Sequence, residues 1–346
     1  MKIAIHHSKI SFSDKWISYC KENDIPFKIV NCYEDDIIQQ LDDCDALMWH
    51  HYHLSERDIL FAKQLLYSLE MSGKIVYPDF RTNWHFDDKL GQKYLLEAID
   101  APLVPSYAFY SKQEASKWAE NAAFPKVFKL RRGSSSRNVR LVKSRKSAFN
   151  MINRAFGRGY KQYDAWDGIS ERWRLYKGGK ANLKEVFDGF ARLIYPIPYS
   201  RILGKDRGYI YFQDFIPDNT HDIRINYVFN KCFGTRRGVR PGDFRASGSW
   251  IVDMDISKIP EQAIKMAFDV AGKLKLQTAA FDFVLHNGKP LIVEVSYGFA
   301  YPPFQFELGY WDADLKYTPG KFNPFGWIVE GVVESIKNHE AKDLKA

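Results

Sequence analysis

Short apolar runs alternate with amphipathic segments over residues 1–80. The apolar runs are KIAIHH, PFKIVNC, DALMWHH and KIVYPD, and helical patterns cover residues 12–23, a short stretch near Ile37 and residues 55–69. This alternation of strand and helix predicts a small, mostly parallel sheet with helices on both faces. In such a sheet, a ligand is expected beyond the carboxyl ends of the strands.

Five of the nine histidines fall at those predicted strand ends. His6 and His7 follow the first strand, and His50, His51 and His53 follow the third. Their rings are candidates for binding a substrate or an anion, and neutral imidazoles are also common metal ligands. The third interpretation is that they are polar strand ends with partly exposed rings. The sequence leaves these three alternatives open.

A second pattern begins at Asn83. A helix is predicted from there through DDKLGQKYLLEAID, followed by the strands PLVPSYAFY, KVFKL and NVRLV. Residues 146–207 are polar but rich in Trp, Tyr and Phe, which favours an inserted folded element over a disordered linker. Beyond them, the pattern predicts a strand YIYFQDFIP, a paired strand DIRINYVFN, a basic turn TRRGVRPGDFR and a helix over residues 260–274.

The segment AAFDFVLHNGKPLIVEVS is typical of a hairpin that carries two carboxylates. Glu294 and Ser296 lie two residues apart on one strand and therefore share a face. A hard cation could lie between them and Asp282 on the other strand. The alternative is a surface hairpin whose acids are simply solvated.

The turn of this hairpin decides whether Asp282 faces Glu294. A two-residue turn at Asn287-Gly288 would put Asp282 opposite Val293, facing away from the glutamate. A three-residue loop over 287–289 would put the two carboxylates opposite each other. We expect the longer loop, because Pro290 then opens the second strand, where its missing N–H is tolerated.

Composition is that of an ordinary soluble protein. The 346 residues allow two or three domains, and no apolar run approaches the roughly 18 residues of a membrane span. The opening MKIAIHHSKI becomes polar too early for a signal peptide, so a cytoplasmic location is expected. The four cysteines form no CxxC pair and are expected to be reduced and partly buried.

The net charge of +8 is spread along the chain, and many basic residues alternate with acids. This distribution favours a solvated surface, or a site for small anionic molecules, over an RNA or DNA interface. A nucleic-acid-binding protein remains a third hypothesis, which would require a salt-dependent association that ATP does not compete away.

Lys129 lies in the predicted strand KVFKL, and the loop RRGSSSR follows that strand. Backbone N–H groups of small residues can approach phosphate oxygens, while Lys129 and the loop residues Arg131, Arg132 and Arg137 supply positive charge. The loop does not match GxxxxGK[ST], so that phosphate-binding mechanism is excluded. An ordinary mobile hairpin is the alternative.

Five segments together resemble the ATP-grasp superfamily, nearest to amino-acid and peptide ligases such as the ribosomal-protein glutamate ligases and the D-alanine–D-alanine ligases. In chain order they are Asn83 with Asp88-Lys89, KVFKLRRGSSS, QDFIPDNTHDIR, RRGVRPGDFRAS, and FDF with IVEVS, which together span roughly residues 80–300.

The resemblance implies an α/β (α+β) fold in three parts. These are a Rossmann-like parallel-sheet domain over 1–82, a central ATP-grasp subdomain over 83–212 with a lid loop and the 146–207 insertion, and a C-terminal subdomain over 213–346 with a magnesium site. In this family the nucleotide binds between the two subdomains. The implied activity is that of an ADP-forming carbon–nitrogen ligase, which joins a carboxylate to an amine through an acyl phosphate with ATP and Mg²⁺ or Mn²⁺. A homodimer is compatible with the sequence.

The resemblance also assigns roles to individual residues. Phosphate binding is implied for Lys89 and Lys129, a lid for Gly133, Ser134, Ser135 and Ser136, adenine recognition for Gln213 with the backbone of Phe215 and Ile216, ribose binding for Asp222, catalysis for Arg245 and Lys129, and magnesium binding for Asp282, Glu294 and Ser296. A salt bridge to Arg224 is the alternative role of Asp222. Substrate binding is a hypothesis for His6, His7, His50, His51 and Arg237.

The chain departs from the family pattern where Ser296 and Ser247 replace the usual asparagines. A serine hydroxyl is a shorter and poorer cation ligand than an amide carbonyl, which puts a second magnesium in question. A non-catalytic or regulatory ATP-binding protein is therefore the second hypothesis. The insertion, the histidines and the aromatic tail YGFAYPPFQFELGYWDAD are candidates to line the acceptor side for a small-molecule, glycan or peptide substrate, although the aromatic residues are also expected in a core.

Overall fold

The structure is a computed structural model in which the chain forms two compact units. It describes residues 1–9, 11–133, 138–162, 198–240, 242–246, 248–249, 251–300 and 303–343, together with scattered positions between 163 and 197. Unit 1 comprises residues 1–86, 99–102 and 219–346, and unit 2 comprises residues 87–98 and 103–218. Each unit is built around its own sheets.

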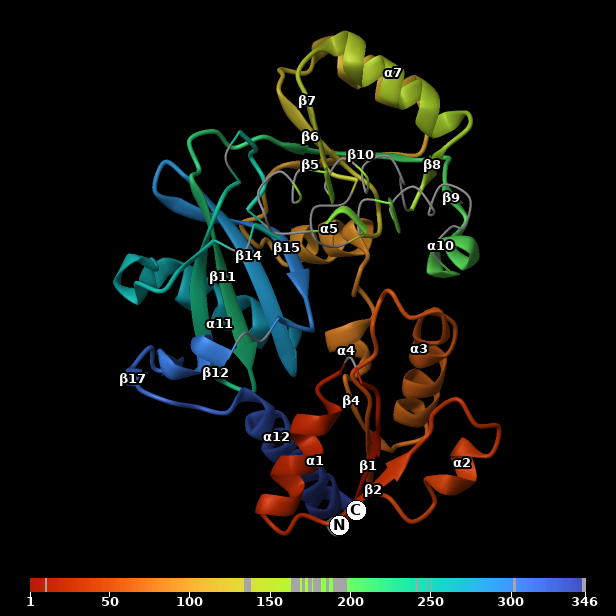
Figure 1. Ribbon diagram of the computed structural model, residues 1–346, viewed down its shortest axis with the longest axis vertical. Coiled ribbons are helices and arrows are strands. Elements are labelled where there is room, and N and C mark those ends of the chain that lie inside the picture. Colours follow the sequence, from red (N-terminus) through yellow and green to blue (C-terminus); the bar gives the residue numbers. More distant parts are fainter. Residues whose placement is uncertain are drawn as a thin grey trace. The chain divides into compact units, whose positions relative to one another are not determined.

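The first sheet of unit 1 is parallel, with the strand order β2-β1-β3-β4 (Figure 1). Its strands are β1 (Ile3–His6), β2 (Phe27–Val30), β3 (Ala46–Met48) and β4 (Ile75–Tyr77), and its helices are α1 (Ser13–Glu22), α2 (Ile37–Gln40), α3 (Glu56–Met71) and α4 (Phe80–Asn83). The start of α3 is fixed by Ser55, whose side chain accepts a hydrogen bond from the Asp58 N–H. The predicted parallel sheet is confirmed.

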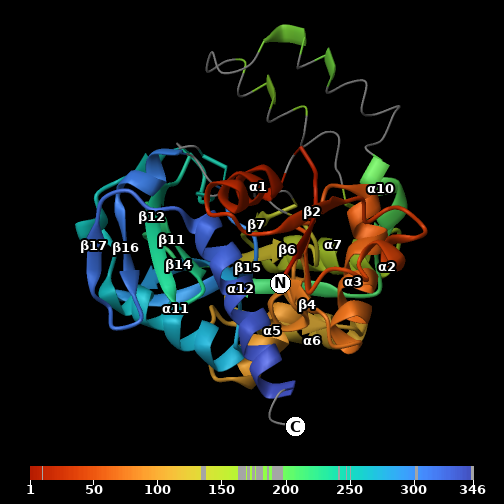
Figure 2. The same cartoon turned by 90° about the horizontal axis from the view of Figure 1, so that it is seen from below.

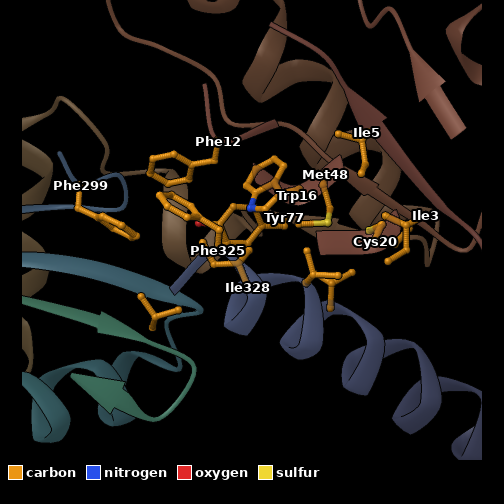
Figure 3. Close-up of a cluster of buried hydrophobic side chains, with 14 of the residues drawn as sticks. Ile3, Ile5, Phe12, Trp16, Cys20, Met48, Tyr77, Phe299, Phe325 and Ile328 are labelled. Carbon is orange, nitrogen blue, oxygen red and sulfur yellow. The ribbon is translucent and has the colours of Figure 1, made fainter. Parts of the chain in front are cut away.

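Both faces of this sheet are buried, because successive side chains of a strand point to opposite sides. Ile3 and Ile5 belong to one apolar cluster, which includes Trp16 of α1 and Phe325 of α12 (Pro324–Asp343) (Figure 3). Ala4, between the two isoleucines, belongs to a second cluster, which is formed with α2 and α3. The sheet is therefore a core layer and not a surface element.

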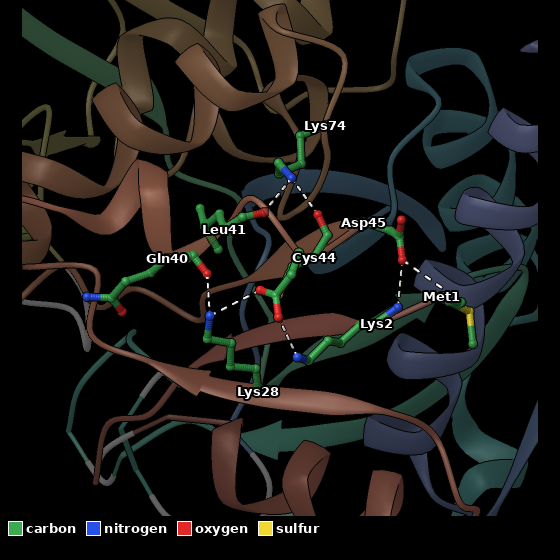
Figure 4. A network of polar contacts seen from close by, with 9 residues as sticks. Met1, Lys2, Lys28, Gln40, Leu41, Cys44, Asp45 and Lys74 are labelled. Carbon is green, nitrogen blue, oxygen red and sulfur yellow. Dashed lines mark hydrogen bonds and ion pairs between the residues drawn. The ribbon is translucent and has the colours of Figure 1, made fainter.

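Three lysines form hydrogen bonds and ion pairs between the loops at the amino ends of the parallel strands (Figure 4). Lys2 and Lys28 both donate to the carboxylate of Asp43, at 2.6 and 3.1 Å, and Lys28 also donates to the Gln40 carbonyl. Lys74 donates to the carbonyls of Leu41 and Cys44. These lysines therefore bind the loops at the amino ends of the strands, whereas the histidines lie at the carboxyl ends.

The second sheet of unit 1 is antiparallel, with the order β15-β14-β11-β12-β16-β17, and β13 pairs with β12. Its strands are β11 (His221–Val228), β12 (Lys231–Gly238), β13 (Val252–Asp253), β14 (Thr278–His286), β15 (Lys289–Ser296), β16 (Gly309–Asp312) and β17 (Tyr317–Pro319). Helix α11 (Glu261–Leu274) lies along β11 and β14 (Figure 2). The turns η1 (Ile256–Lys258) and η2 (Pro303–Glu307) complete this part.

Polar contacts as well as the apolar cluster join the two sheets of unit 1. The Tyr77 hydroxyl hydrogen-bonds the Thr278 hydroxyl at 3.0 Å, and the Tyr297 hydroxyl donates to the carbonyl of His51 at 2.5 Å. Gln277 accepts from the Asp79 N–H and donates to another backbone carbonyl of the same segment. The end of β15 is therefore held against the end of β3.

Unit 2 contains a four-stranded antiparallel sheet with the order β5-β10-β6-β7. Its elements are α5 (Lys89–Ala98), β5 (Ser106–Phe109), α6 (Lys112–Asn121), β6 (Lys126–Lys129), β7 (Arg140–Val142), α7 (Arg145–Phe156), β8 (Tyr160–Lys161), α10 (Pro198–Leu203), β9 (Lys205–Asp206) and β10 (Ile210–Asp214). Phe128 and Phe212 face the helices α6 and α7 and form one apolar cluster with them. The opposite face carries Ser106, Lys129, Tyr211 and Gln213.

Three of the predicted elements differ in the structure. The helix predicted from Asn83 begins only at Lys89, as α5, because α4 ends at Asn83 and the residues between them are not helical, with a φ of 55° at Asp87. Strand β11 pairs with β12 and β14 and not with the preceding strand β10. The residues TRRG of the predicted basic turn lie in β12, because they pair with β11.

The aromatic tail contributes to the core, which is one of the two interpretations offered for it. Phe299 is 5% exposed in the cluster of Figure 3, and Phe306 and Tyr310 pack against that cluster. The four cysteines are free and buried, as expected. None of the helices in the described part of the chain combines the length and the apolar character needed to span a bilayer.

Two helical glycines offer a matched test of the packing of unit 1. A methyl group at Gly326 in α12 would overlap the ring of Tyr19 in α1, whereas nothing lies within 4 Å of a methyl group at Gly272 in α11. We expect Gly326→Ala to lower the free energy of unfolding by about 1–3 kcal/mol through overpacking. We expect Gly272→Ala to raise it by about 0.4–1 kcal/mol, because alanine restricts the unfolded chain. Urea denaturation measures both, and equal effects would contradict the α1–α12 packing.

Candidate functional site: two polar sheet faces

The polar face of the unit 2 sheet brings Lys129 and Gln213 together. Lys129 is opposite Tyr211, and Gln213 follows two residues along the same strand, so the three side chains share a face. The Lys129 ammonium donates to the Gln213 Oε1 at 2.6 Å, and both residues are buried. Burying an ammonium group is costly unless it has polar partners. The hydrogen bond to Gln213 provides such a partner and orients the Lys129 side chain along this face.

Lys89 lies beside the start of the loop for which the family resemblance implies a lid role. Its backbone N–H donates to the Arg131 carbonyl at 2.9 Å, and its ammonium donates to the Gly133 carbonyl at 2.8 Å. Gly133 adopts a φ of 122°, which favours glycine, and its N–H donates to Asp87 at 2.7 Å. The base of the loop is thus fixed to the start of α5.

Of the remaining predicted residues of unit 2, the structure describes Phe215 and Ile216 but not the three serines of the loop. Phe215 and Ile216 directly follow β10 and are half-buried. Ser134, Ser135 and Ser136 lie outside the described residues, so their predicted lid role stays a prediction. Arg137 lies in the same undescribed stretch.

Several polar residues of this face were not singled out from the sequence. Ser106 accepts hydrogen bonds from Gln213 and Tyr211, and in turn donates to a backbone carbonyl at 2.7 Å. Tyr209 accepts the Arg131 N–H at 2.7 Å. The alternation in YIYFQD could have indicated Tyr209 and Tyr211 because they share a face with Gln213, whereas Ser106 carried no comparable signal.

In unit 1, the turn of the acidic hairpin differs from the expectation. His286 pairs with Lys289, so Asn287-Gly288 is a two-residue turn, and both turn residues have positive φ, 51° and 76°. This is the turn that an Asn-Gly pair favours. The predicted three-residue loop is therefore wrong.

Pro290 is tolerated for a different reason from the one expected. It faces Leu285, whose N–H and carbonyl are turned away from β15 and bond the side chain of Asn219 at 2.8 and 3.0 Å. Pro290 thus occupies a pair without ladder hydrogen bonds, on the edge strand of the sheet.

Asp282 nevertheless lies opposite Glu294, as predicted, because β15 contains a bulge. The register shifts by one residue between the pairs Phe283–Ile292 and Asp282–Glu294, which leaves Val293 as the extra residue. Ile292 and Val295, three residues apart, are both buried, which strict alternation would not allow. The bulge turns Glu294 to the polar face.

Two rows of side chains cross this polar face. The pairings align Thr235, Arg224, Asp282 and Glu294 in one row and Phe233, Asn226, Ala280 and Ser296 in the next. Glu294 and Ser296 therefore share a face with Asp282, as the spacing predicted. The opposite face carries apolar side chains such as Phe281 and Phe283.

Two arginines hold the carboxylate of Asp282. Arg224 donates to both of its oxygens at 2.7 Å, and Arg237 reaches one of them at 2.9 Å while also bonding Asp222. Burial alone would raise the pKa of Asp282, but the charges of Arg224 and Arg237 outweigh burial and lower it. Burial raises the pKa of Asp222, against the opposing effect of Arg237.

The oxygen atoms of Asp282, Glu294 and Ser296 suit magnesium, provided that the arginines release part of Asp282. Asp282 and Glu294 face each other and share their face with the Ser296 hydroxyl, and oxygen donors of this kind are those that Mg²⁺ prefers. A cation on Asp282 must displace at least part of the guanidinium contact. No group of three or more His, Cys, Asp or Glu side chains suited to a metal occurs among the described residues.

Two other predicted residues have partners that the sequence did not identify. Asp222 forms its ion pair with Arg237 and not with Arg224, the partner that the sequence suggested. Arg245 donates to both carboxylate oxygens of Asp243, at 2.9 and 3.0 Å from its Nε. Burial alone would raise the pKa of Asp243, but the hydrogen bonds and the positive charge of Arg245 outweigh burial and lower it.

The histidines at the strand ends are mostly interior. His6 accepts the Cys32 N–H at its Nδ1, and His51 bonds Asn83 at 2.7 Å through its Nε2. Burial lowers the pKa of His6 to about 4 and that of His51 to about 3. His50 stacks on Phe12, whereas His7 is exposed and bonds Ser13. The interpretation as partly exposed strand ends is therefore wrong for His6 and His51.

Comparison with solved structures identifies the fold as ATP-grasp. The chain is similar to the D-cycloserine synthetase DcsG, with 12% identity, a TM-score of 0.58 and coverage of 97% of this chain and 100% of that one. It is similar to the RimK domain ATP-grasp protein of Sphaerobacter thermophilus, with 14% identity, a TM-score of 0.56 and coverage of 96% and 100%. For the D-alanine–D-alanine ligase of Bacillus anthracis in complex with ATP, the identity is 14%, the TM-score 0.56 and the coverage 98% of both chains.

Comparison of sequences adds no nearer relative. No protein-family model matches the chain, and no curated protein matches it. The structural similarity extends over nearly the whole chain and establishes the α/β ATP-grasp fold.

The pairing of Arg224 with Asp282 can be measured by a double-mutant cycle. We expect Arg224→Gln and Asp282→Asn to show a coupling energy of about 1–3 kcal/mol in urea unfolding, because the pair is largely buried and joined by two hydrogen bonds. The half-exposed i,i+4 pair Lys93–Glu97 is the control, with an expected coupling of about 0.3–0.5 kcal/mol. Equal couplings would contradict the buried pair.

The buried histidines predict a loss of stability in mild acid. Below a pH of about 6.5 the unfolded chain protonates His6 and His51, whereas the folded chain keeps them neutral because burial lowers each pKa. The unfolded state then binds more protons, so each histidine lowers the free energy of unfolding by about 1.4 kcal/mol per pH unit. Urea unfolding between pH 7 and 5 measures the slope. His51→Gln should make it shallower, and an unchanged slope would contradict the assignment.

Proposed function

We propose that this protein is an ADP-forming carboxylate–amine ligase that uses ATP and magnesium. In the proposed reaction, a carboxylate substrate attacks the terminal phosphoryl group of ATP, and an amine then displaces phosphate from the acyl phosphate to form an amide. The observation that carries the proposal is the pairing of Asp282 with Glu294 on a charged sheet face, in a chain with the ATP-grasp fold. The solved relatives include a D-alanine–D-alanine ligase in complex with ATP and the ligase PsnB with Mg and ADP.

The proposed roles follow from charge and position. Lys89 and Lys129 offset the charge of the ATP phosphates, Gln213 recognises the adenine amino group, and Arg245 meets the charge that develops on the transferred phosphoryl group. Magnesium, when bound by Asp282 and Glu294, would neutralise and orient phosphate oxygens. Such transfers need positioning and charge neutralisation more than covalent help from the protein. Ser134, Ser135 and Ser136, with Gly133, are proposed to exclude water as a lid.

The contacts of Asp282 give the proposed site a further property. Its carboxylate is bound by Arg224 and Arg237, so a cation must exchange with a guanidinium group. The displaced guanidinium becomes able to pair with another anion, such as a phosphate or a substrate carboxylate. We therefore retain Arg237 as a proposed substrate-binding residue. The ribose role of Asp222 and the boundaries of the three domains at residues 82 and 212 also stay proposals.

The second candidate function is ATP binding without ligation. Ser296 favours it, because a hydroxyl is a weaker ligand for a second magnesium than an amide oxygen. Product analysis separates the candidates, since only a ligase forms ADP in proportion to a new amide bond.

Nucleotide binding is the first test of the proposal. We expect calorimetry to detect MgATP binding, and Glu294→Gln to weaken it about 10-fold or more, because the variant loses one charged oxygen ligand. Glu340→Gln, at an exposed position of α12, is the control and should bind as the wild type does. Absence of nucleotide binding to the wild type, or equal affinity of Glu294→Gln, would defeat the proposed site.

A further inference from the structure

The positive charge of this protein is concentrated in one stretch of unit 2. Between Glu120 and Asp164 the chain has twelve lysines and arginines and no aspartate or glutamate. The net charge of the whole chain is only +8, so the rest of the chain carries more acidic than basic residues. This stretch is therefore an exception to the alternation of basic and acidic residues found elsewhere.

Eight cations on α7 and on the ribbon of β8 and β9 form what we call the α7 surface. They are Lys143, Arg145, Lys146, Arg154, Arg158, Lys161, Lys205 and Arg207, all exposed except the half-buried Arg154. None of the eight forms an ion pair with any residue in the described part of the chain. Asp206, the one acidic residue of the ribbon, accepts a hydrogen bond from Gln162. The surface thus keeps its positive charge uncompensated.

Backbone hydrogen bonds fix the ribbon to the carboxyl end of α7, where Figure 1 shows β8. Lys161 of β8 pairs with Lys205 of β9. The Gly208 N–H, just beyond β9, donates to the carbonyl of Ala155 in the last turn of α7 at 3.1 Å. The cations of the ribbon therefore lie beside those at the end of the helix.

The outer face of α7 joins the two ends of this surface. Lys146, Asn150, Asn153 and Gly157 are exposed and follow one another at helical spacing, so they share a face. The inner face packs in the apolar cluster through Ala148, Ile152 and Ala155. Because α7 has 12 residues, the cations at its two ends are about 18 Å apart, with the two asparagine amides between them.

The stability of α7 does not account for this arrangement. Lys143, Arg145 and Lys146 lie at the amino end of the helix, where the helix dipole is positive and cations are unfavourable. The first turn of α7 has no acidic residue, whereas the first turn of α3 carries Glu56 and Asp58. An anionic partner would remove the repulsion that these charges create.

The composition of the surface distinguishes between anionic partners. No large hydrophobic side chain is exposed among the described residues between 126 and 161. A stable protein interface needs an apolar or aromatic centre, and a helix that binds a membrane inserts apolar side chains. Interfaces with nucleic acids are instead polar and strongly positive, with Lys, Arg, Asn and Ser side chains on the phosphates. The surface also exposes no aromatic ring on which unpaired bases could stack, which favours a duplex.

We propose that the α7 surface binds the phosphate backbone of a nucleic-acid duplex, independently of its base sequence. This binding is separate from the proposed ATP site. Phe128 and Phe212 face α7, whereas Lys129 and Gln213 lie on the opposite face of the unit 2 sheet. The inference therefore does not depend on the ligase function.

Fluorescence anisotropy with the intact chain tests the proposal. The probes are two short RNA duplexes of unrelated sequence and the DNA duplex of one of them, each with Mg²⁺ and a saturating non-hydrolysable ATP analogue. We expect a Kd on the order of 1–100 μM near 0.15 M salt, equal for the unrelated sequences. The logarithm of the association constant should fall with the logarithm of the salt concentration with a slope of about −4 to −7, for five to eight phosphate contacts.

Two double variants with the same change of charge show whether the α7 surface is responsible. Lys143→Gln combined with Lys146→Gln should make the slope shallower by about 2, because two phosphate contacts are lost. Lys112→Gln combined with Lys117→Gln, at exposed positions of α6, is the control and should leave the slope unchanged. Neither double variant should lower the melting temperature or weaken binding of MgATP.

Three results would overturn the inference. The first is absence of duplex binding, and the second is an equal change of slope in both double variants, which would mean that only the overall charge attracts the duplex. The third is tighter binding of poly-glutamate, or of vesicles that contain phosphatidylserine, through Lys143 and Lys146, which would make the partner an acidic polypeptide or a membrane. Duplex binding that depends on these lysines in a protein that does not bind ATP would support the inference while the proposed ligase function fails.

Discussion

One extra residue in β15 determines the chemistry of the charged sheet face. The Asn287-Gly288 turn alone would align Asp282 with Val293 and direct Glu294 toward α11. The bulge at Val293 shifts the register by one residue, so that Glu294 joins Asp282 and Ser296 on one face while Ile292 and Val295 stay in the core. Bulges commonly redirect a side chain next to a functional site. The proposed metal site depends on this irregularity.

In each unit, helices cover the apolar face of an antiparallel sheet. A sheet must bury one face, and helices cover the apolar side in both cases: α6 and α7 over Phe128 and Phe212, and α11 over the β11–β14 pair. The other face of each sheet is free to carry polar groups, and the two-residue period of a strand gathers them there. Lys129 and Gln213 share one such face, and Asp282 and Glu294 share the other.

Elements with a clear alternation or periodicity could be predicted from the sequence. So could pairs of residues two apart on one strand, which point to the same face of the sheet. The parallel N-terminal sheet, helix α11 and the shared face of Glu294 and Ser296 follow from patterns of 3.6 or two residues. The bulge could not be predicted, because it depends on how Ile292 and Val295 pack together. The pairing of Asp222 with Arg237 was also missed, since TRRG was assigned to a turn when it forms part of β12. Long-range partners such as Asn219 and Leu285 carry no local signal.

Anomalous X-ray diffraction from crystals grown with Mn²⁺ and a non-hydrolysable ATP analogue tests the central claim most directly. The account predicts a manganese peak at about 2.1 Å from carboxylate oxygens of both Asp282 and Glu294, with at least one guanidinium displaced from Asp282. A bound nucleotide without manganese at these two residues, or with the contacts of both Arg224 and Arg237 to Asp282 intact, would contradict it.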